Sequence, residues 1–288
     1  MLEFGILGSG FGLYGYLPAV VKSGHKVVIP RRYETALYSR PELTDYRNFI
    51  SFESETQLVH DCKNIILALD PGTQYETILN SDFDGKRLWL EKPLAPSIIK
   101  HQEVIDLIKV RGYQFSIGYL FRFTNWWRRI VNPTPRGVGE KFSIYWEMPA
   151  PMGWKNSSNA GGGIVSFYAI HFAPLLSDNI WVLEKSEISK EKDKVKFLLL
   201  HNCGSTIQVE VNYGNQYTFD VLALKKNSPH EVVFNGKSPF GDLPLSGIAD
   251  PRLPFLCEYL EEGLTNSDQT FDHLVLEQIA IDFRKSFL

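Results

Sequence analysis

The first nineteen residues constrain the fold of this chain more than any other stretch. Leu2–Leu7 is an apolar run long enough for one buried strand of a parallel sheet, and it leads directly into Gly8-Ser9-Gly10-Phe11-Gly12. A helix from Leu13 to Lys22 is predicted to follow. Gly8 permits a tight turn, Gly10 lets the backbone approach a pyrophosphate, and the N–H groups at the helix start can bind its charge. The sequence therefore predicts a dinucleotide-binding turn at residues 8–12.

The turn lacks the third glycine of the usual fingerprint. Leu13 stands where the helix packs closest to the strand, although Gly12 and Gly15 flank that position and offer a shifted register. A glycine turn also occurs where no ligand binds. Its place directly after a strand at the N-terminus favours nucleotide binding.

The end of the second predicted strand, His25–Pro30, indicates which cofactor is used. An enzyme that uses NAD usually carries Asp or Glu here to bind the ribose hydroxyls, whereas this chain continues as Arg31-Arg32-Tyr33. Guanidinium groups form strong charge-assisted hydrogen bonds to phosphate, so the sequence favours NADP(H) over NAD(H). The alternative is that both arginines are merely solvated at a strand end.

Strands and helices alternate as far as residue 120. Further strands are expected at 64–69, 87–90 and 115–119, a connecting segment at 46–52, and helices at 56–61, 75–80 and 97–112. This alternation predicts a doubly wound, Rossmann-type parallel sheet. Two loops, Asp70-Pro71-Gly72 and Glu91-Lys92-Pro93, follow strands at the ligand-binding edge, and we expect both to contact the cofactor.

The pattern changes after residue 120 to period-two strands with one wetter face, as in Phe142–Trp146 and Ile207–Tyr213. Helices are expected at 164–176, 254–263 and 271–287, and turns at 202–205, 214–215 and 235–236, the last as a hairpin. The sequence thus predicts a dinucleotide-binding domain at 1–120 and an α+β domain at 121–288, with a largely antiparallel open sheet, for substrate binding and oligomerisation.

Composition excludes several classes of partner. The 288 residues are 44% hydrophobic and carry a formal net charge of −3, without the basic tract of a nucleic-acid-binding protein. The three cysteines lack metal-ligand spacing, so we expect no metal and a reducing compartment. No apolar run is long enough to span a bilayer, and a cytoplasmic protein without membrane association is the expectation.

Lys92 is the best catalytic candidate by position. A lysine at the end of a buried strand, with its pKa lowered from about 10.4 toward 7 or 8, can donate a proton to a carbonyl oxygen. A cis bond to Pro93 would aim the ammonium group. The alternative is a solvated lysine with no role.

Together these motifs resemble one family. The glycine turn, Glu91-Lys92-Pro93-Leu94, Gly118-Tyr119, Arg122-Phe123, and Gly161-Gly162-Gly163 leading to His171 occur in the order and spacing typical of the glucose-fructose oxidoreductase, inositol dehydrogenase and rhizopine catabolism (Gfo/Idh/MocA) family of NAD(P)-dependent oxidoreductases. The resemblance covers residues 1 to about 175. It implies that Lys92 is catalytic, that His171 binds substrate or relays a proton, and that the open sheet forms a dimer face.

The chain departs from the family pattern at informative positions. Phe167 replaces the acidic residue that usually lies four positions before the histidine, and Tyr75 replaces a frequent histidine. Either His171 acts without the acid, or Tyr168 supplies a hydroxyl, or the catalytic role is lost. A histidine that is simply packed on an apolar helix is an equal alternative.

For substrate contacts the sequence offers four further residues. Trp154 and Lys155 precede the glycine triplet in a loop, and Tyr119 and Arg122 follow the last strand of the first half. The other tryptophans are more typical of a core.

The predicted function is interconversion of a carbonyl and a hydroxyl on a sugar, sugar nucleotide or polyol, linked to NADPH, with Lys92 as proton donor or acceptor. A non-catalytic NADP(H)-binding regulatory protein is the alternative, and a reductase of an imine or tetrapyrrole is a second one. A homodimer or homotetramer through the second sheet is expected, because that sheet has no helices to cover both faces.

Overall fold

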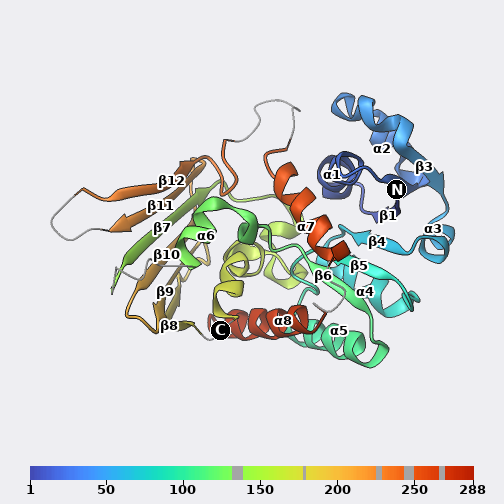
Figure 1. Ribbon diagram of the computed structural model, residues 1–288. Coiled ribbons are helices and arrows are strands. Elements are labelled where there is room, and N and C mark those ends of the chain that lie inside the picture. Colours follow the sequence, from blue (N-terminus) through green and yellow to red (C-terminus); the bar gives the residue numbers. More distant parts are fainter. Residues whose placement is uncertain (132–138, 178–179, 225–228, 243–249, 266–269) are drawn as a thin grey trace. The chain divides into compact units, whose positions relative to one another are not determined.

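The computed structural model describes residues 1–131, 139–177, 180–224, 229–242, 250–265 and 270–288, and it divides into two compact units (Figure 1). Unit 1 consists of Met1–Leu120 and Pro244–Leu274, and unit 2 of Phe121–Leu243 and Val275–Leu288. The chain therefore leaves unit 1 after Leu120 and returns to it with the segment that carries helix α7, Leu253–Thr265.

Unit 1 is built on a sheet of six parallel strands in the order β3-β2-β1-β4-β5-β6. This is the strand order of the doubly wound Rossmann fold, and the predicted fold class is confirmed. Its reversal point lies between β1 and β4, so ligands are expected at the carboxyl ends of these strands. The strands are β1 (Glu3–Leu7), β2 (Lys26–Pro30), β3 (Ile50–Glu53), β4 (Asn64–Leu67), β5 (Arg87–Leu90) and β6 (Gln114–Ile117).

The helices of unit 1 begin and end at residues with recognisable capping chemistry. The Ser97 hydroxyl caps α5 at its start, and Gly112 ends this helix in the left-handed conformation with φ 67°, as the sequence predicts. Helices α4 and α5 pack side by side, and α7 packs against α1 (Figure 1). The helices are α1 (Leu17–Lys22), α2 (Glu34–Tyr38), α3 (Glu55–Asp61), α4 (Pro71–Asn80), α5 (Ile98–Arg111) and α7.

Two predictions for unit 1 were wrong in detail. Residues 46–52 were expected to form only a connecting segment, but β3 begins at Ile50 and pairs with β2. This edge strand has four residues that alternate in exposure, and so short a hydrophobic pattern is too weak to be detected in the sequence. The helix after the glycine turn starts as a π-helical turn, Gly12–Tyr16, before α1. Pro18 has no N–H to donate to the carbonyl four residues earlier, which accounts for the distortion expected there.

Unit 2 is built on a second six-stranded sheet in the order β12-β11-β7-β10-β9-β8. Every pairing is antiparallel except that of β7 with β10, which is parallel. Helix α6 (Asn125–Val131) belongs to unit 2, and α8 (Thr270–Lys285) begins in unit 1 and continues in unit 2. The strands are β7 (Lys141–Met148), β8 (Trp181–Ile188), β9 (Lys194–His201), β10 (Thr206–Tyr213), β11 (Thr218–Leu224) and β12 (Glu231–Gly236).

The turn predictions for unit 2 had mixed outcomes. The turn at 202–205 joins β9 to β10, and the Ser205 carbonyl accepts the His201 N–H at 2.8 Å. The hairpin predicted at Asn235-Gly236 was wrong, because both residues lie in β12 and pair with Phe219 and Asp220 of β11. A two-residue turn signal is overridden when strand pairing satisfies the same backbone groups.

The helix predicted at 164–176 is not α-helical. It consists of a π-helical turn, Ile164–Tyr168, followed by 3-10 turns, Ala169–Leu176, that contain Pro174. Residues 167 and 171 therefore do not share one α-helical face, as the four-residue spacing had implied.

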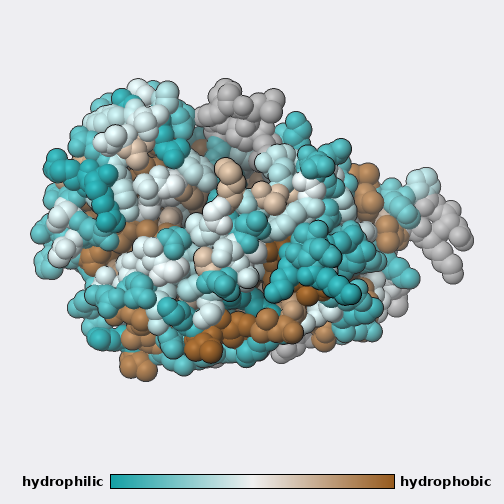
Figure 2. Space-filling view, turned by 180° about the vertical axis from the view of Figure 1, so that it is seen from behind, coloured by the Kyte–Doolittle hydropathy of each residue, from teal (hydrophilic) through white to brown (hydrophobic). Residues whose placement is uncertain are grey.

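The surface is mixed in character. Figure 2 shows hydrophilic residues over most of one face, with hydrophobic patches between them. Among the described residues, no helix combines the length and apolarity needed to cross a membrane.

Candidate functional site

The turn after β1 has the geometry that glycine alone allows. Gly8 has φ +136°, and a Cβ at this position would lie 2.2 Å from the Ala68 carbonyl oxygen of the neighbouring strand end. A Cβ at Gly12 would lie 3.0 Å from Ile6 Cγ2, so Gly12 provides the close approach of helix to strand. The position of a Cβ on Gly10 has nothing within 4 Å. The turn is therefore open at Gly10, where the fingerprint places a pyrophosphate.

The Phe11 side chain leaves this opening uncovered. Its ring folds back over Gly15, where an added Cβ would lie 2.2 Å from a ring carbon, and it lies 5.1 Å from the Tyr16 ring. The described residues offer no hydrogen-bond partner to the N–H groups of Ser9 and Gly10. These two donors and the open space fit the phosphates of a dinucleotide.

The end of β2 carries the two arginines; Arg31 contacts β3 itself, and Arg32 contacts the segment that follows it. Arg31 Nη2 donates to the Phe52 carbonyl at 3.3 Å, and Arg32 forms an ion pair with Glu55. Arg32 Nη2 also donates to the Tyr33 hydroxyl at 3.2 Å, and the same hydroxyl accepts the Gly8 N–H at 3.2 Å. The β2 end is thus tied directly to the glycine turn.

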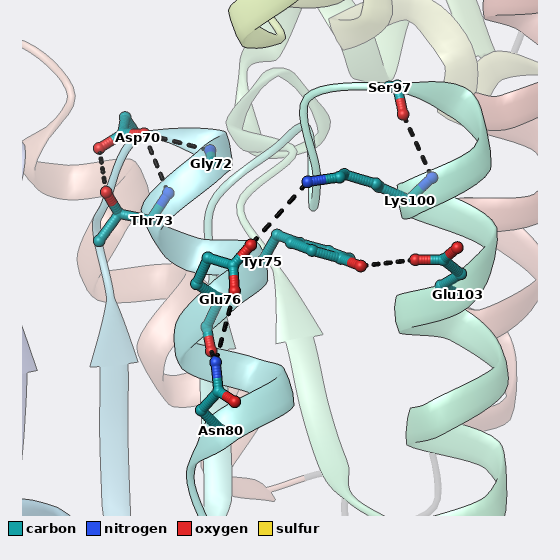
Figure 3. Close-up of polar contacts among 9 residues, drawn as sticks. All are labelled: Asp70, Gly72, Thr73, Tyr75, Glu76, Asn80, Ser97, Lys100 and Glu103. Carbon is teal, nitrogen blue, oxygen red and sulfur yellow. Dashed lines mark hydrogen bonds and ion pairs between the residues drawn. The ribbon is translucent and has the colours of Figure 1, made fainter.

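The end of β4 is shaped by Asp70, which the sequence placed in a loop before a helix that was expected to start at Tyr75. The helix α4 begins earlier, at Pro71, because the Asp70 carboxylate caps it: Oδ1 accepts the N–H groups of Gly72 and Thr73 at 3.1 and 3.0 Å (Figure 3). Tyr75 is 8% exposed. The Asp70 carboxylate therefore serves as the N-cap of α4, and Pro71 is the first residue of this helix.

Tyr75, which stands where relatives frequently have histidine, connects α4 to α5. Its hydroxyl donates to Glu103 at 2.6 Å, and Lys100 Nζ lies 4.3 Å from the ring centre and 3.9 Å from Glu76 (Figure 3). The bond to Glu103 raises the pKa of Tyr75 to about 12. This hydroxyl therefore stays protonated at neutral pH and serves as a donor between the helices.

The end of β5 holds Lys92 in a fully defined turn. Lys92 is 6% exposed, and the Lys92–Pro93 peptide bond is cis. Gln74 of α4, which is completely buried, clamps this turn: Nε2 donates to the Glu91 carbonyl at 2.7 Å and to that of Leu94 at 3.4 Å. Its Oε1 accepts the Glu91 N–H at 3.2 Å. One side-chain amide thus fixes the backbone on both sides of Lys92.

A second contact fixes the Glu91 side chain. The Tyr16 hydroxyl, in a residue with 0% exposure, donates to Glu91 Oε1 at 2.5 Å. A Cβ at Gly118 would lie 3.1 Å from both oxygens, so the glycine leaves room for the pair. Burial raises the pKa of Glu91, against the opposing effects of the Tyr16 bond and the nearby charges of Lys92 and Arg252. Burial and the Glu91 charge raise the pKa of Tyr16 well above its ordinary value.

Arg252, from the segment that returns to unit 1, lies against Phe11 of the glycine turn. Its guanidinium stacks on the Phe11 ring at 4.1 Å and is held by Asp250, through Nε at 2.8 Å and Nη2 at 2.6 Å. The pKa of Arg252 is raised because the Asp250 bonds and charge outweigh burial, which alone would lower it. This residue brings a fixed positive charge to the start of the first helix.

The residues predicted from the family pattern beyond position 120 lie in unit 2. The His171 ring stacks on Phe121, with centroids 4.3 Å apart and planes at 13°. Tyr168 packs edge-on against Trp146 at 5.1 Å, and its burial raises its pKa to about 12. The Phe167 ring packs edge-on against Trp154, with centroids 5.4 Å apart. The aromatic side chain therefore fills space beside the loop, in place of an acid that would orient the histidine.

The loop before the glycine triplet packs closely against Gly162 and Phe167. A Cβ at Gly162 would lie 2.1 Å from the Trp154 carbonyl, and Lys155 Nζ lies 5.3 Å from the Phe167 ring. Both Trp154 and Lys155 remain partly exposed. Arg122 is also partly exposed, whereas Tyr119 of unit 1 is 0% exposed, so its side chain is a core residue in this structure.

The structure brings together in unit 1 the predicted residues at the ends of β1, β2, β4 and β5. Sequence analysis did not identify the residues that hold them, because their side-chain contacts to these turns leave no periodic signal in the sequence: Tyr16, Tyr33, Glu55, Gln74 and Arg252. In the described part of the chain, no group of three or more His, Cys, Asp or Glu side chains is arranged to hold a metal ion.

Comparison with solved structures finds the same fold in many oxidoreductases. A myo-inositol dehydrogenase from Corynebacterium glutamicum aligns with a TM-score of 0.70 at 15% identity, over 100% of this chain and 96% of that one. A 3-ketoreductase from Actinomadura kijaniata, solved with NADP and TDP-benzene, gives 0.68 at 13% identity over 99% and 98%. A scyllo-inositol dehydrogenase from Lactobacillus casei gives 0.65 at 17% over 100% and 96%.

No protein-family model and no curated protein matches the sequence. At these identities the similarity establishes the fold, which this chain shares with inositol dehydrogenases and a probable dehydrogenase. The resemblance predicted from the sequence is confirmed at that level.

Proposed function

We propose that this protein is an NAD(P)-dependent oxidoreductase that interconverts a carbonyl and a hydroxyl on a sugar-like or polyol substrate, with Lys92 as the proton donor or acceptor. The observation that carries the proposal is the buried, doubly clamped position of Lys92 at the carboxyl end of β5, in the same unit as an open glycine turn. Neighbours with this fold include sugar and polyol dehydrogenases and a 3-ketoreductase solved with NADP.

The residues of unit 1 fit a nicotinamide dinucleotide. Ser9 and Gly10 would bind its phosphates through their available N–H donors and the open space at Gly10, while Gly8 and Gly12 allow the tight turn and the close approach of the helix that form this site. Arg31 and Arg32 would bind a 2′-phosphate and so favour NADP(H), and the Asp70-Pro71 and Glu91-Pro93 turns would line the nicotinamide half. When bound, the nicotinamide supplies or accepts the hydride.

The chain itself supplies the proton and the charge. In reduction, the Lys92 ammonium donates a proton to the oxygen that was the carbonyl; in oxidation, the neutral amine accepts it from the hydroxyl. A positive charge fixed in a buried site also stabilises developing alkoxide charge without reorganisation. Gln74 and the Tyr16–Glu91 pair keep the turn in place during this transfer.

For the substrate, the partly exposed side chains of Trp154, Lys155 and Arg122 are the proposed contacts. Aromatic faces support sugar rings, and a lysine or arginine can bind hydroxyl or phosphate groups. The roles predicted for His171 and Tyr168 rest on the family resemblance.

The test is turnover of NADPH and NADP⁺ with a panel of sugars, sugar nucleotides, polyols and their keto forms. Lys92→Met keeps the length of the side chain but removes the proton, and it should reduce turnover by about a hundredfold or more with cofactor affinity unchanged. Lys63→Met is the control, since Lys63 is exposed at the opposite end of β4. Near-normal turnover by the Lys92 variant would refute its role.

A second candidate is a non-catalytic, NADP(H)-binding regulatory protein. Phe167 favours it, because this side chain packs on Trp154 at the position where the family has an acid. This candidate predicts NADPH binding without turnover of any compound in the panel. One robust activity that depends on Lys92 would eliminate it.

We also propose that the second sheet mediates a homodimer or homotetramer. Val182 and Leu200 are register partners on adjacent strands and are 57% and 39% exposed, so they form an apolar pair on the sheet surface. Light scattering at micromolar concentration should show an oligomer that Leu200→Glu weakens. A wild-type monomer would contradict this assignment.

A further inference from the structure

The two arginines that follow β2 are held in different ways. Strands β2 and β3 are parallel with Pro30 opposite Glu53, so the segments after both strands lie at one edge of the sheet. Arg31 donates to a neutral carbonyl, that of Phe52, at 3.3 Å. Arg32 instead pairs with the carboxylate of Glu55, the first residue of α3. Of the two positive charges, one is compensated by a carboxylate from the neighbouring strand end.

The Glu55–Arg32 pair is connected to the glycine turn. Arg32 Nη2 donates to the Tyr33 hydroxyl at 3.2 Å, and this hydroxyl accepts the Gly8 N–H at 3.2 Å. The side chains of Arg32 and Glu55 are 61% and 38% exposed, so both are accessible to a ligand bound at this edge. Among the described residues, no carboxylate pairs with Arg31 in the same way.

A phosphate and a carboxylate compete for the same guanidinium donors. Arginine binds either anion through two parallel hydrogen bonds, so a 2′-phosphate that uses Arg32 must displace Glu55 or bind beside its negative charge. A ribose hydroxyl, in contrast, is uncharged and can itself donate to a carboxylate. Glu55 therefore opposes a phosphorylated ribose and tolerates an unphosphorylated one.

We propose that Glu55 sets the choice between NADPH and NADH by occupying Arg32, so that preference for NADPH depends mainly on Arg31. This inference rests on the proposed nucleotide binding and adds to it a residue that determines specificity. Glu55 lies outside the glycine turn and the β2 end, the two places where the sequence indicates cofactor choice.

The test is a double-mutant cycle measured by isothermal titration at fixed ionic strength. Glu55→Gln releases Arg32 and should tighten NADPH binding roughly three- to tenfold, while NADH affinity changes by less than about twofold. Arg32→Met in the Glu55→Gln background should abolish the gain, since the released guanidinium causes it. The probes 2′,5′-ADP and 5′-AMP repeat the comparison with the adenosine half alone.

Glu53→Gln is the matched control. Glu53 is an exposed acid two residues earlier at the same strand end, and its substitution changes the net charge by the same amount. A gain in NADPH affinity equal to that of Glu55→Gln would show a general charge effect and overturn the proposal. Glu55→Ala, which removes the carboxylate in another way, should act in the same direction as Glu55→Gln.

The binding results distinguish a failure of this inference from a failure of the proposed function. If NADPH binds and the Glu55 variants leave the ratio of NADPH to NADH affinity unchanged, the inference fails while the proposed function stands. If neither nucleotide nor either adenosine probe binds the wild-type protein, the proposed function fails and this inference fails with it.

Discussion

The ends of β5 and β2 hold their charged residues in opposite ways. At β5, Lys92 is 6% exposed and its turn is clamped by Gln74, which is completely buried. At β2, Arg32 is 61% exposed and pairs with a carboxylate that is itself accessible. Buried hydrogen bonds are costly to break, whereas exposed ion pairs contribute little and exchange partners easily. The difference matches the proposed roles, in which β5 holds a catalytic lysine in a fixed geometry and β2 selects between NADPH and NADH.

The largest expected effect comes from breaking the clamp at β5. Gln74→Leu leaves the carbonyls of Glu91 and Leu94 without the amide donor, so it should reduce the free energy of unfolding by about 2–4 kcal/mol. Urea unfolding measures this loss. Gln102→Leu is the control on α5, because within the described part of the chain the Gln102 amide bonds only to Asp106, in an exposed contact. A change within about 0.5 kcal/mol is expected there. Equal losses of unfolding free energy in the two variants would show that the Gln74 hydrogen bonds add no stability.

The glycine turn should show a smaller loss that separates stability from binding. Gly8→Ala places a Cβ 2.2 Å from a backbone carbonyl at φ +136°, and we expect a loss of about 2–3 kcal/mol. Gly10→Ala meets nothing within 4 Å and should leave the unfolding free energy within about 0.5 kcal/mol of wild type. Calorimetric or urea unfolding of both variants tests this. A stable Gly8→Ala protein would mean that the turn is not rigid.

The Tyr16–Glu91 pair predicts a pH-dependent effect. Burial raises the pKa of Glu91 in the folded protein above its value in the unfolded chain. The protonated carboxyl therefore contributes its full stabilisation below the unfolded-state pKa, and this stabilisation is lost as the pH rises through the folded-state pKa. Tyr16→Phe removes a bond that opposes this rise, and its destabilisation should grow by about 1 kcal/mol between about pH 4 and pH 8. Unfolding at a series of pH values measures it. In a Glu91→Gln background the pH dependence of the Tyr16 effect should vanish, and its persistence would assign it elsewhere.

The smallest expected change in stability is at the exposed end of β2. Arg31→Met removes a guanidinium that, among the described residues, is held only by the Phe52 carbonyl. The change should weaken NADPH binding by about tenfold with little effect on NADH binding or on stability. Titration with both nucleotides at constant salt provides the measurement. If NADPH and NADH weaken equally, Arg31 has no contact with a 2′-phosphate.

The sequence predicted the strand, turn and helix order of unit 1 because continuous apolar runs and glycine turns are local signals. It missed β3 from Ile50, since a short edge strand is only half buried, and it misjudged Asn235-Gly236, where pairing with β11 prevails over turn preference. The α-helix expected at 164–176 failed for a related reason, because Pro174 and a π-helical turn interrupt a segment whose composition alone suggests a regular helix.

Part of the candidate site could also be predicted from local signals in the sequence. Lys92 and the turn at 8–12 follow strands directly, so their shared edge could be inferred from the strand pattern. Gln74, Tyr16 and Glu55 could not, because what they do is set by contacts to residues 17 to 75 positions away, and no pattern in the sequence marks such contacts. Polar residues on helices usually face solvent, so the sequence alone predicts that such side chains are exposed and not that they hold a buried turn.

The central claim is that the open turn after β1 binds a nicotinamide dinucleotide. The most direct measurement is the affinity of NADPH for wild-type protein and for Gly10→Ala, with unfolding recorded for both. The account predicts saturable binding that the added methyl group weakens by about tenfold or more while stability is unchanged. Absence of binding to the wild type, or equal affinity of the two proteins, would contradict it.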